Sequence, residues 1–281
     1  MKALEVRNVT YKYPIARTNV LENISFSVNK GEFVAIVGKN GCGKTTLCNI
    51  LRGFIPSFHQ GKFAGTVLIN EKNIKQMSMG EIAVAIGFVF QNPFIQVSGI
   101  KHSVFNEVAY GLENLGIDRE EMIGRTEQIL KDLKMNDLRD KHPVELSGGQ
   151  RQRVALASVL VMDPDILIID EPTSQLDPQS TEKVFEIIRL LKERNKTIIL
   201  VEHKIDLISE YADRVILIDD KRIVFDDLTQ KVLVNKKVLS YGVNLPQVAK
   251  LGIKFEEQTD FRLDYIPSVL TDAINVFKKY V

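Results

Sequence analysis

The sequence has no tryptophan and only two cysteines, Cys42 and Cys48, which lie in one short segment. Spaced pairs of cysteines are absent, so the chain has no disulfide framework, which is typical of proteins from a reducing compartment. Neither cysteine has a histidine or an acidic residue beside it at the spacing of metal ligands. The cysteines therefore do not indicate a metal site.

Long apolar runs are lacking as well. No stretch approaches the roughly 18 uninterrupted apolar residues expected of a membrane-spanning helix. The first residues, "MKALEVRNVTYKYP", contain no apolar segment of the kind found in signal peptides. We therefore expect a cytosolic protein, and any role at a membrane must depend on a partner.

An excess of charge of either sign is also missing. The 281 residues have a formal net charge of +1, with 26% charged and 44% hydrophobic residues. This balance is that of an ordinary globular protein and gives no overall field that would attract nucleic acid or an anionic membrane. The length fits one large domain, or one medium domain with an appendage.

Short apolar runs indicate a mainly parallel sheet. Residues 33–37 are all apolar, enter a glycine-rich loop and precede Leu47, Ile50 and Leu51, which recur at helical spacing. A run without polar alternation predicts a strand that is buried on both faces. Similar short runs occupy residues 86–91, 165–170, 197–203 and 214–219.

Other segments predict the remaining parts of an α/β fold. Alternating residues around 24–28 and 63–70 predict antiparallel strands, and residues 222–227 close a hairpin. Helical periodicity marks an insert at about 92–163. We predict one domain over residues 1–228, and residues 229–281 as a small α+β extension.

The stretch "GKNGCGKTT", residues 38–46, fits a phosphate-binding loop through Gly38, Gly43, Lys44 and Thr45. Glycines let the backbone amides wrap around phosphate oxygens at the start of a helix. Lys44 would reach the β- and γ-phosphates, and the Thr45 hydroxyl would bind Mg²⁺. The same loop also contains the predicted nucleotide-binding residues Asn40, Gly41, Cys42 and Thr46.

Carboxylates follow the apolar strand of "DILIIDEP", residues 165–172. Ligands of open α/β sheets bind at the carboxyl ends of the strands. Asp170 could hold Mg²⁺ and Glu171 could orient or deprotonate the attacking water. Gln91 and His203 end two other predicted strands, and are candidates for contacts with Mg²⁺ and with the γ-phosphate. Each could equally be an ordinary surface residue.

Three further residues, Cys42 in the phosphate-binding loop and Tyr11 and Tyr13 just after the first predicted strand, have alternative interpretations. Cys42 lies near a helix N-terminus that could lower its pKa, but a small loop residue without chemical role is the preferred interpretation. Tyr11 and Tyr13 could pack as strand aromatics, or one could stack on adenine, for which Tyr13 is the candidate.

Taken in order, these motifs resemble the ATP-binding-cassette (ABC) ATPase family over about residues 2–228. The most specific is "LSGGQ", residues 146–150, which lies between the phosphate loop and the acidic strand and precedes "SQLD" at 174–177. The resemblance implies an ATPase with a P-loop NTPase core, an antiparallel subdomain and a helical subdomain. It implies Glu171 as catalytic carboxylate, His203 as γ-phosphate sensor, Gln91 as a link to a membrane partner, and Asp170 as metal ligand.

In this family two cassettes pair head to tail, so the signature segment (residues 146–150) would serve the nucleotide of a partner. Ser147 offers a hydroxyl, and Gly148 and Gly149 offer backbone amides at a helix start. The resemblance places Gln150 in the same segment, and Asp177 in the loop that connects the two sites. The expected ligands are ATP and Mg²⁺.

Finer similarity points to energy-coupling-factor transporters, which import vitamins and metal ions. It is carried by "FVFQNP" (88–93), "VFNEVAYGLENLG" (104–116) and "YGVNLPQVAKLG" (241–252), although Phe94, Ile95, Glu202 and Lys204 depart from the usual pattern. The implied partners are a second ATPase, identical or paralogous, a membrane coupling protein and a substrate-binding membrane subunit, at the cytoplasmic face of the membrane. The extension would help the ATPases dimerise.

Phe94, Ile95 and Phe105 could form the groove in which an amphipathic coupling helix docks, or could simply pack the helical insert. Two other functions are possible. One is a nucleotide-gated interaction module that does not hydrolyse ATP. The other is a soluble ABC protein that acts on nucleic acid, which we do not expect because no basic groove is visible.

Overall fold

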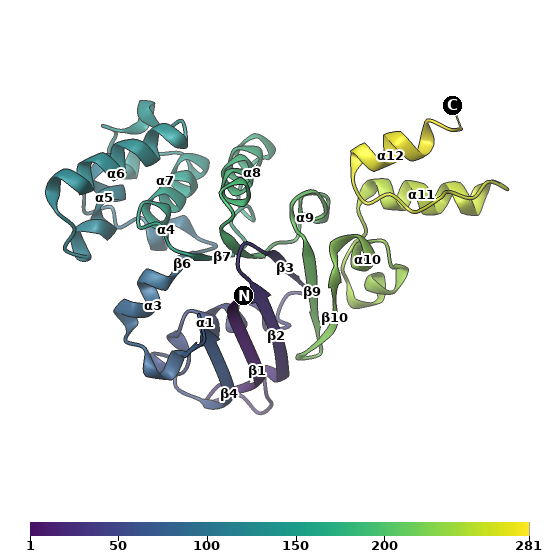
Figure 1. Cartoon of the computed structure of the whole chain (residues 1–281), viewed down its shortest axis with the longest axis horizontal. Helices are drawn as coiled ribbons and strands as arrows, with labels where there is room; N and C mark the ends of the chain where they lie inside the picture. Colours follow the sequence, from purple (N-terminus) through teal and green to yellow (C-terminus); the bar gives the residue numbers. More distant parts are fainter. Residues whose placement is uncertain (281) are drawn as a thin grey trace.

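A six-stranded sheet forms the centre of the computed structural model, which describes residues 1–280 (Figure 1). Its strand order is β10-β9-β3-β8-β7-β6. Neighbouring strands from β9 to β6 are parallel, and β10 pairs with β9 as an antiparallel hairpin. The strands are β3 (Phe33–Val37), β6 (Ile86–Val89), β7 (Ile166–Asp170), β8 (Thr197–Val201), β9 (Arg214–Asp219) and β10 (Arg222–Leu228).

A second, antiparallel sheet packs against the first, with the order β2-β1-β4-β5. Its strands are β1 (Lys2–Lys12), β2 (Leu21–Asn29), β4 (Lys62–Ile69) and β5 (Lys72–Asn73). In β2 the apolar residues alternate with polar ones and point inward, so Ile24 and Val28 are fully buried. The predicted antiparallel strands are thus present.

The central sheet is buried on both faces, as the uninterrupted apolar run of β3 predicts. Phe33 and Ala35 contribute to the core that also contains apolar residues of the helices on one side. Val34 and Ile36 point the other way, into the core shared with the antiparallel sheet. Alternate side chains of one strand therefore hold the two halves of the molecule together.

Helices connect the strands and cover the sheet. The segment between β6 and β7 contains α4 (Pro93–Gln96), α5 (Val104–Asn114), α6 (Arg119–Asp132) and α7 (Gly148–Leu160), with short 3₁₀ turns at Asn136–Leu138 and Pro143–Glu145. The other helices of the main body are α1 (Lys44–Leu51), α2 (Phe54–Ser57), α3 (Met79–Ala85), α8 (Pro178–Glu193) and α9 (Ile205–Tyr211), with a 3₁₀ turn at Ile74–Gln76. None of the helices within residues 1–280 combines the length and apolarity needed to cross a bilayer.

The C-terminal region is helical and lies at one end of the molecule (Figure 1). It contains α10 (Thr229–Leu233), a 3₁₀ segment (Lys236–Tyr241), α11 (Gln247–Gln258) and α12 (Leu270–Phe277). The strand pieces expected here are wrong for residues 229–280. Ala249, Gly252 and Ile253 repeat at helical spacing, and short apolar runs do not distinguish a strand from a helix.

Candidate functional site

The phosphate loop (residues 38–46) joins β3 to α1, and its backbone requires glycine at two points. Gly38 and Gly43 have φ angles of 152° and 106°. A Cβ atom on Gly38 would lie 2.2 Å from the Ile218 carbonyl oxygen, and one on Gly43 would lie 2.7 Å from Leu21 Cδ2. The loop therefore combines a left-handed backbone with close packing, and only glycine meets both conditions.

Lys44 lies across this loop with its side chain buried. Its ammonium donates hydrogen bonds to the carbonyls of Gly38 at 2.9 Å and Lys39 at 3.1 Å, and the residue is 5% exposed. Within residues 1–280 no carboxylate forms an ion pair with it. A buried ammonium at a helix N-terminus, held only by carbonyl dipoles, is suited to bind phosphate oxygens.

Asp170, the last residue of β7, is 3% exposed. Burial raises the pKa of its carboxyl group, and the Thr45 hydroxyl and the charge of Lys44 oppose that rise. Among the described residues, Asp170 Oδ1 has no hydrogen-bond partner. A buried carboxylate oxygen without a partner, beside a hydroxyl, provides the hard oxygen ligands that Mg²⁺ prefers.

Three strand ends converge on the Glu171 carboxylate. Gln91 follows β6 and its Nε2 donates to Glu171 Oε2 at 2.8 Å. His203 follows β8 and its Nε2 lies 3.0 Å from Glu171 Oε1. Glu171 has a φ angle of 46°, and its N–H donates to the Val201 carbonyl at 2.8 Å. The carboxylate is thus held by groups from both neighbouring strands.

A cleft of about 300 Å³ brings eight of the predicted residues together. It is lined by Val20, Asn40, Gly41, Gly43, Lys44, Thr45, Thr46, Gln91 and Glu171. The acidic strand end and the phosphate loop therefore face the same space, which is what an ATP-hydrolysing site requires.

Tyr13 and Tyr11 occupy different environments. Tyr11 is fully buried, and its hydroxyl donates to the Gln60 carbonyl at 2.9 Å. Tyr13 is half-buried, packs edge-on against Tyr11, and its Oη lies 3.1 Å from Thr46 Oγ1 at the phosphate loop. Of the two tyrosines, Tyr13 is the one with a hydrogen bond to a residue of the phosphate loop.

Cys42 packs into the loop, close to Gly38, where a Cβ would come within 2.8 Å of its Sγ. Burial raises the pKa of its thiol, and the charge of Lys44 only partly opposes this. A lowered pKa, the alternative considered from the sequence, is therefore wrong. The geometry is that of a small packing residue.

The signature segment begins α7. Ser147 and Gln150 form reciprocal caps, because Ser147 Oγ accepts from the Gln150 N–H and Gln150 Oε1 accepts from the Ser147 N–H. Ser147 and Gly148 are exposed. None of residues 146–150 lines the cleft beside the phosphate loop of the same chain.

Asp177 caps α8 and connects it to the signature segment. It accepts hydrogen bonds from the Ser180 N–H at 2.9 Å and from the Ser180 hydroxyl at 2.6 Å, which lower the pKa of its carboxyl. Ser180 packs so tightly against Gly149 that a Cβ there would lie 2.3 Å from Ser180 Oγ. Sequence analysis missed Ser180, because this contact joins separate helices.

A second network missed from the sequence surrounds His203. Glu202 is 2% exposed and accepts a hydrogen bond from the Thr173 hydroxyl. Burial raises the pKa of Glu202, and the Thr173 bond opposes this. Lys204 Nζ donates to Thr181 Oγ1 at 2.6 Å. Glu202 and Lys204, two of the four residues that depart from the family pattern, thus attach the end of β8 to the loop after β7 and to α8.

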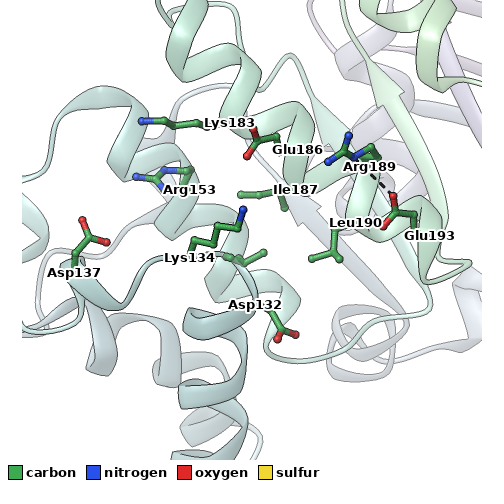
Figure 2. A pocket seen from close by; sticks show the side chains of 11 residues that line it. Asp132, Lys134, Asp137, Arg153, Lys183, Glu186, Ile187, Arg189, Leu190 and Glu193 are labelled. Atoms are coloured by element: carbon green, nitrogen blue, oxygen red, sulfur yellow. Dashed lines mark ion pairs between the residues drawn. The ribbon is translucent and has the colours of Figure 1, made fainter.

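A second cleft, of about 370 Å³, lies between α6, α7 and α8 (Figure 2). Side chains of both signs line it, including Lys134, Arg153, Lys183, Asp137 and Glu186. It contains none of the predicted site residues, so cavity size alone does not locate the nucleotide site.

Comparisons with known proteins show the family to which the chain belongs. The sequence profile of the ABC transporter family matches residues 21–174. The chain is 43% identical to a putative ABC transporter ATP-binding protein of Pyrococcus abyssi over 92% of both chains. It is 39% identical to the energy-coupling factor transporter ATP-binding protein EcfA1 of Oenococcus oeni, over 95% of this chain and 96% of that protein.

Two solved structures share the fold. CbiO1 of Clostridium perfringens, described as part of the ABC transporter complex cbiONQ, has a TM-score of 0.75 and 32% identity, covering 91% of this chain and 99% of its own. A dimeric ATP-binding cassette bound to ADP and Pi has a TM-score of 0.68 and 28% identity, covering 80% and 98%. The chain therefore belongs to the ABC transporter family, and it is an ATP-binding ATPase subunit of that family.

Proposed function

We propose that this chain hydrolyses ATP for a membrane importer of the energy-coupling-factor type, working as a head-to-tail pair of cassettes. The observation that carries the proposal is the Glu171 carboxylate, held between Gln91 and His203 in the cleft that also contains the phosphate loop. A carboxylate in this position can accept a proton from a water aimed at the γ-phosphate.

The roles of the other residues follow from their positions. Lys44 and the amides of the phosphate loop bind the phosphates. Thr45, Asp170 and Gln91 would hold Mg²⁺, which when bound neutralises charge on the phosphate oxygens. His203 and Gln91 orient Glu171, and Tyr13 lies where an adenine ring could stack.

The second half of the site is proposed to come from another cassette. Ser147 and Gly148 are exposed at the N-terminus of α7 and do not line the cleft of their own chain. The amides and the hydroxyl there suit a γ-phosphate that is presented across an interface. The partner cassette is a second copy of this chain or a paralogue.

The membrane partners are proposed from the relatives. EcfA1 is named as part of an energy-coupling factor transporter, and CbiO1 is described as part of an ABC transporter complex. We infer for this chain a membrane coupling protein and a substrate-binding subunit, uptake of a vitamin or metal ion, and a position at the cytoplasmic face of the membrane. Residues 229–281 are the proposed dimerisation module, beside a cassette at 1–228.

A docking surface for the coupling protein is proposed on α4 and the loop after it. Phe94, Ile95 and Ile100 are 60%, 69% and 74% exposed, which is unusual for large apolar side chains close together. Phe105 does not belong to this surface, because it packs against the core and under Arg139. An amphipathic helix is the partner chemistry that fits.

The first prediction concerns Glu171. Glu171→Gln should lower phosphate release about 100-fold or more, because the amide cannot accept the proton of the attacking water. ATP binding, measured by equilibrium dialysis, should persist. Glu182→Gln on the exposed face of α8 is the control and should retain activity. Equal phosphate release by both variants would favour a different base, and no release by the native chain with any cassette partner would favour a non-hydrolysing module.

The second prediction is that substitutions at the two signature glycines, Gly148 and Gly149, have different effects on activity and on stability. Space around a Cβ on Gly148 is open, whereas a Cβ on Gly149 collides with Ser180. Gly148→Leu should therefore fold normally but lose ATPase activity, because the side chain fills the approach of the partner nucleotide. Gly149→Leu should lower the free energy of unfolding by about 1–3 kcal/mol. Urea unfolding and ATPase assays measure both, and full activity of Gly148→Leu would count against the shared site.

The third prediction concerns the docking surface. Ile95→Asp should reduce recovery of membrane subunits when the tagged chain is purified from detergent-solubilised membranes of its source, because a carboxylate replaces an apolar contact. Ile15→Asp, at a residue that is 97% exposed elsewhere on the surface, is the matched control. Undiminished recovery with Ile95→Asp would place the docking surface elsewhere.

A further inference from the structure

Arg151, in the first turn of α7, is a buried cation near the signature segment. It is only 9% exposed, and its Nη2 donates to the Val144 carbonyl at 3.0 Å. Within residues 1–280 its buried Nε has no hydrogen-bond partner. A guanidinium in such a site needs another source of stabilisation, because burying an unpaired donor is costly.

Phe94 supplies that stabilisation. The Arg151 guanidinium carbon lies 3.9 Å from the centre of the Phe94 ring, which is the distance of a cation–π contact. Phe94 is 60% exposed, whereas Arg151 beneath it is only 9% exposed and its Nε is buried. One face of the Phe94 ring therefore packs on the Arg151 guanidinium, and the rest of the side chain is open to solvent.

The same short helix, α4, lies beside α7 (Figure 1), and a second side-chain contact attaches it there. Gln96 Nε2 donates to the Ala155 carbonyl at 3.0 Å, and Gln96 Oε1 accepts from the Phe90 N–H at 3.1 Å. Ala155 and Arg151 are four residues apart in α7 and so lie on one face of the helix. The segment that follows Gln91 is thus fixed to α7 at two successive turns.

We propose that Arg151, covered by Phe94, is a positioning residue that fixes the position of the signature segment. A change at α4 would therefore alter where Ser147 and Gly148 lie. The guanidinium joins three segments: α4 through Phe94, the turn before the signature through Val144, and α7 itself. The Arg151 N–H also donates to the Ser147 carbonyl at 2.9 Å, in the first bond of the helix.

The inference rests on the proposed function, because it assigns the signature segment to a partner's nucleotide. Beyond that function, Phe94 and Arg151 connect the docking surface to the signature segment within one chain. The exposed part of Phe94 belongs to the proposed docking surface and its other face contacts Arg151. A partner that moves or covers Phe94 therefore acts on α7 without touching the phosphate loop.

Amide hydrogen exchange of the full-length chain tests the positioning role. In Phe94→Leu, exchange at Gln150 and Arg151 should become about fivefold faster, the change expected when a contact worth ~1 kcal/mol is lost. Phe94→Tyr keeps an aromatic face and should exchange like the native chain. Phe58→Leu makes the same substitution at another Phe, 64% exposed, and should leave residues 150–151 unchanged.

Arg151→Lys keeps the charge but loses the planar group, so it should match Phe94→Leu, and the double variant should show little further increase. Where the native chain hydrolyses ATP, kcat should fall in Phe94→Leu with KM for ATP unchanged, since the phosphate loop is intact. Native exchange rates at residues 150–151 in Phe94→Leu would overturn the inference. Lack of hydrolysis by the native chain would count against the proposed function and leave the exchange result standing.

Discussion

The parallel register of β6, β7 and β8 is the constraint on which the site depends. It brings Gln91, Glu171 and His203 to one edge of the sheet, where the two outer side chains contact the central carboxylate. The bond from the Glu171 N–H to the Val201 carbonyl fixes that carboxylate relative to β8. A slip of one residue in either pairing would turn these side chains to the opposite face of the sheet.

The same chain holds its signature segment away from this edge, at the exposed start of α7. Ser147 and Gln150 cap each other, and Gly149 packs on Ser180, so the turn is fixed before any nucleotide arrives. Asp177 bonds the same serine, so Ser180 links the loop before α8 to the signature segment within one chain. Preorganisation of this kind lowers the cost of forming the shared site.

Sequence patterns predicted the features that depend on neighbouring residues in the chain. The apolar run of β3, the glycines of the phosphate loop and the carboxylates at the end of β7 each carry a local signal, and the structure places them as expected. Contacts between separate elements carried no such signal. The stack of Phe94 on Arg151, the bond of Thr173 to Glu202 and the packing of Ser180 on Gly149 all required the structure. The strands expected after residue 229 failed because short apolar runs fit a helix equally well.

The central claim is that the nucleotide site is completed by a signature segment from a second cassette. The mass of the Glu171→Gln chain in Mg-free solution, measured by light scattering with and without ATP, tests this most directly. For a pair of identical cassettes, the account predicts a monomer without nucleotide and a particle of two chains with ATP. A chain that binds ATP and remains a monomer would contradict a site that two copies of this chain complete for each other.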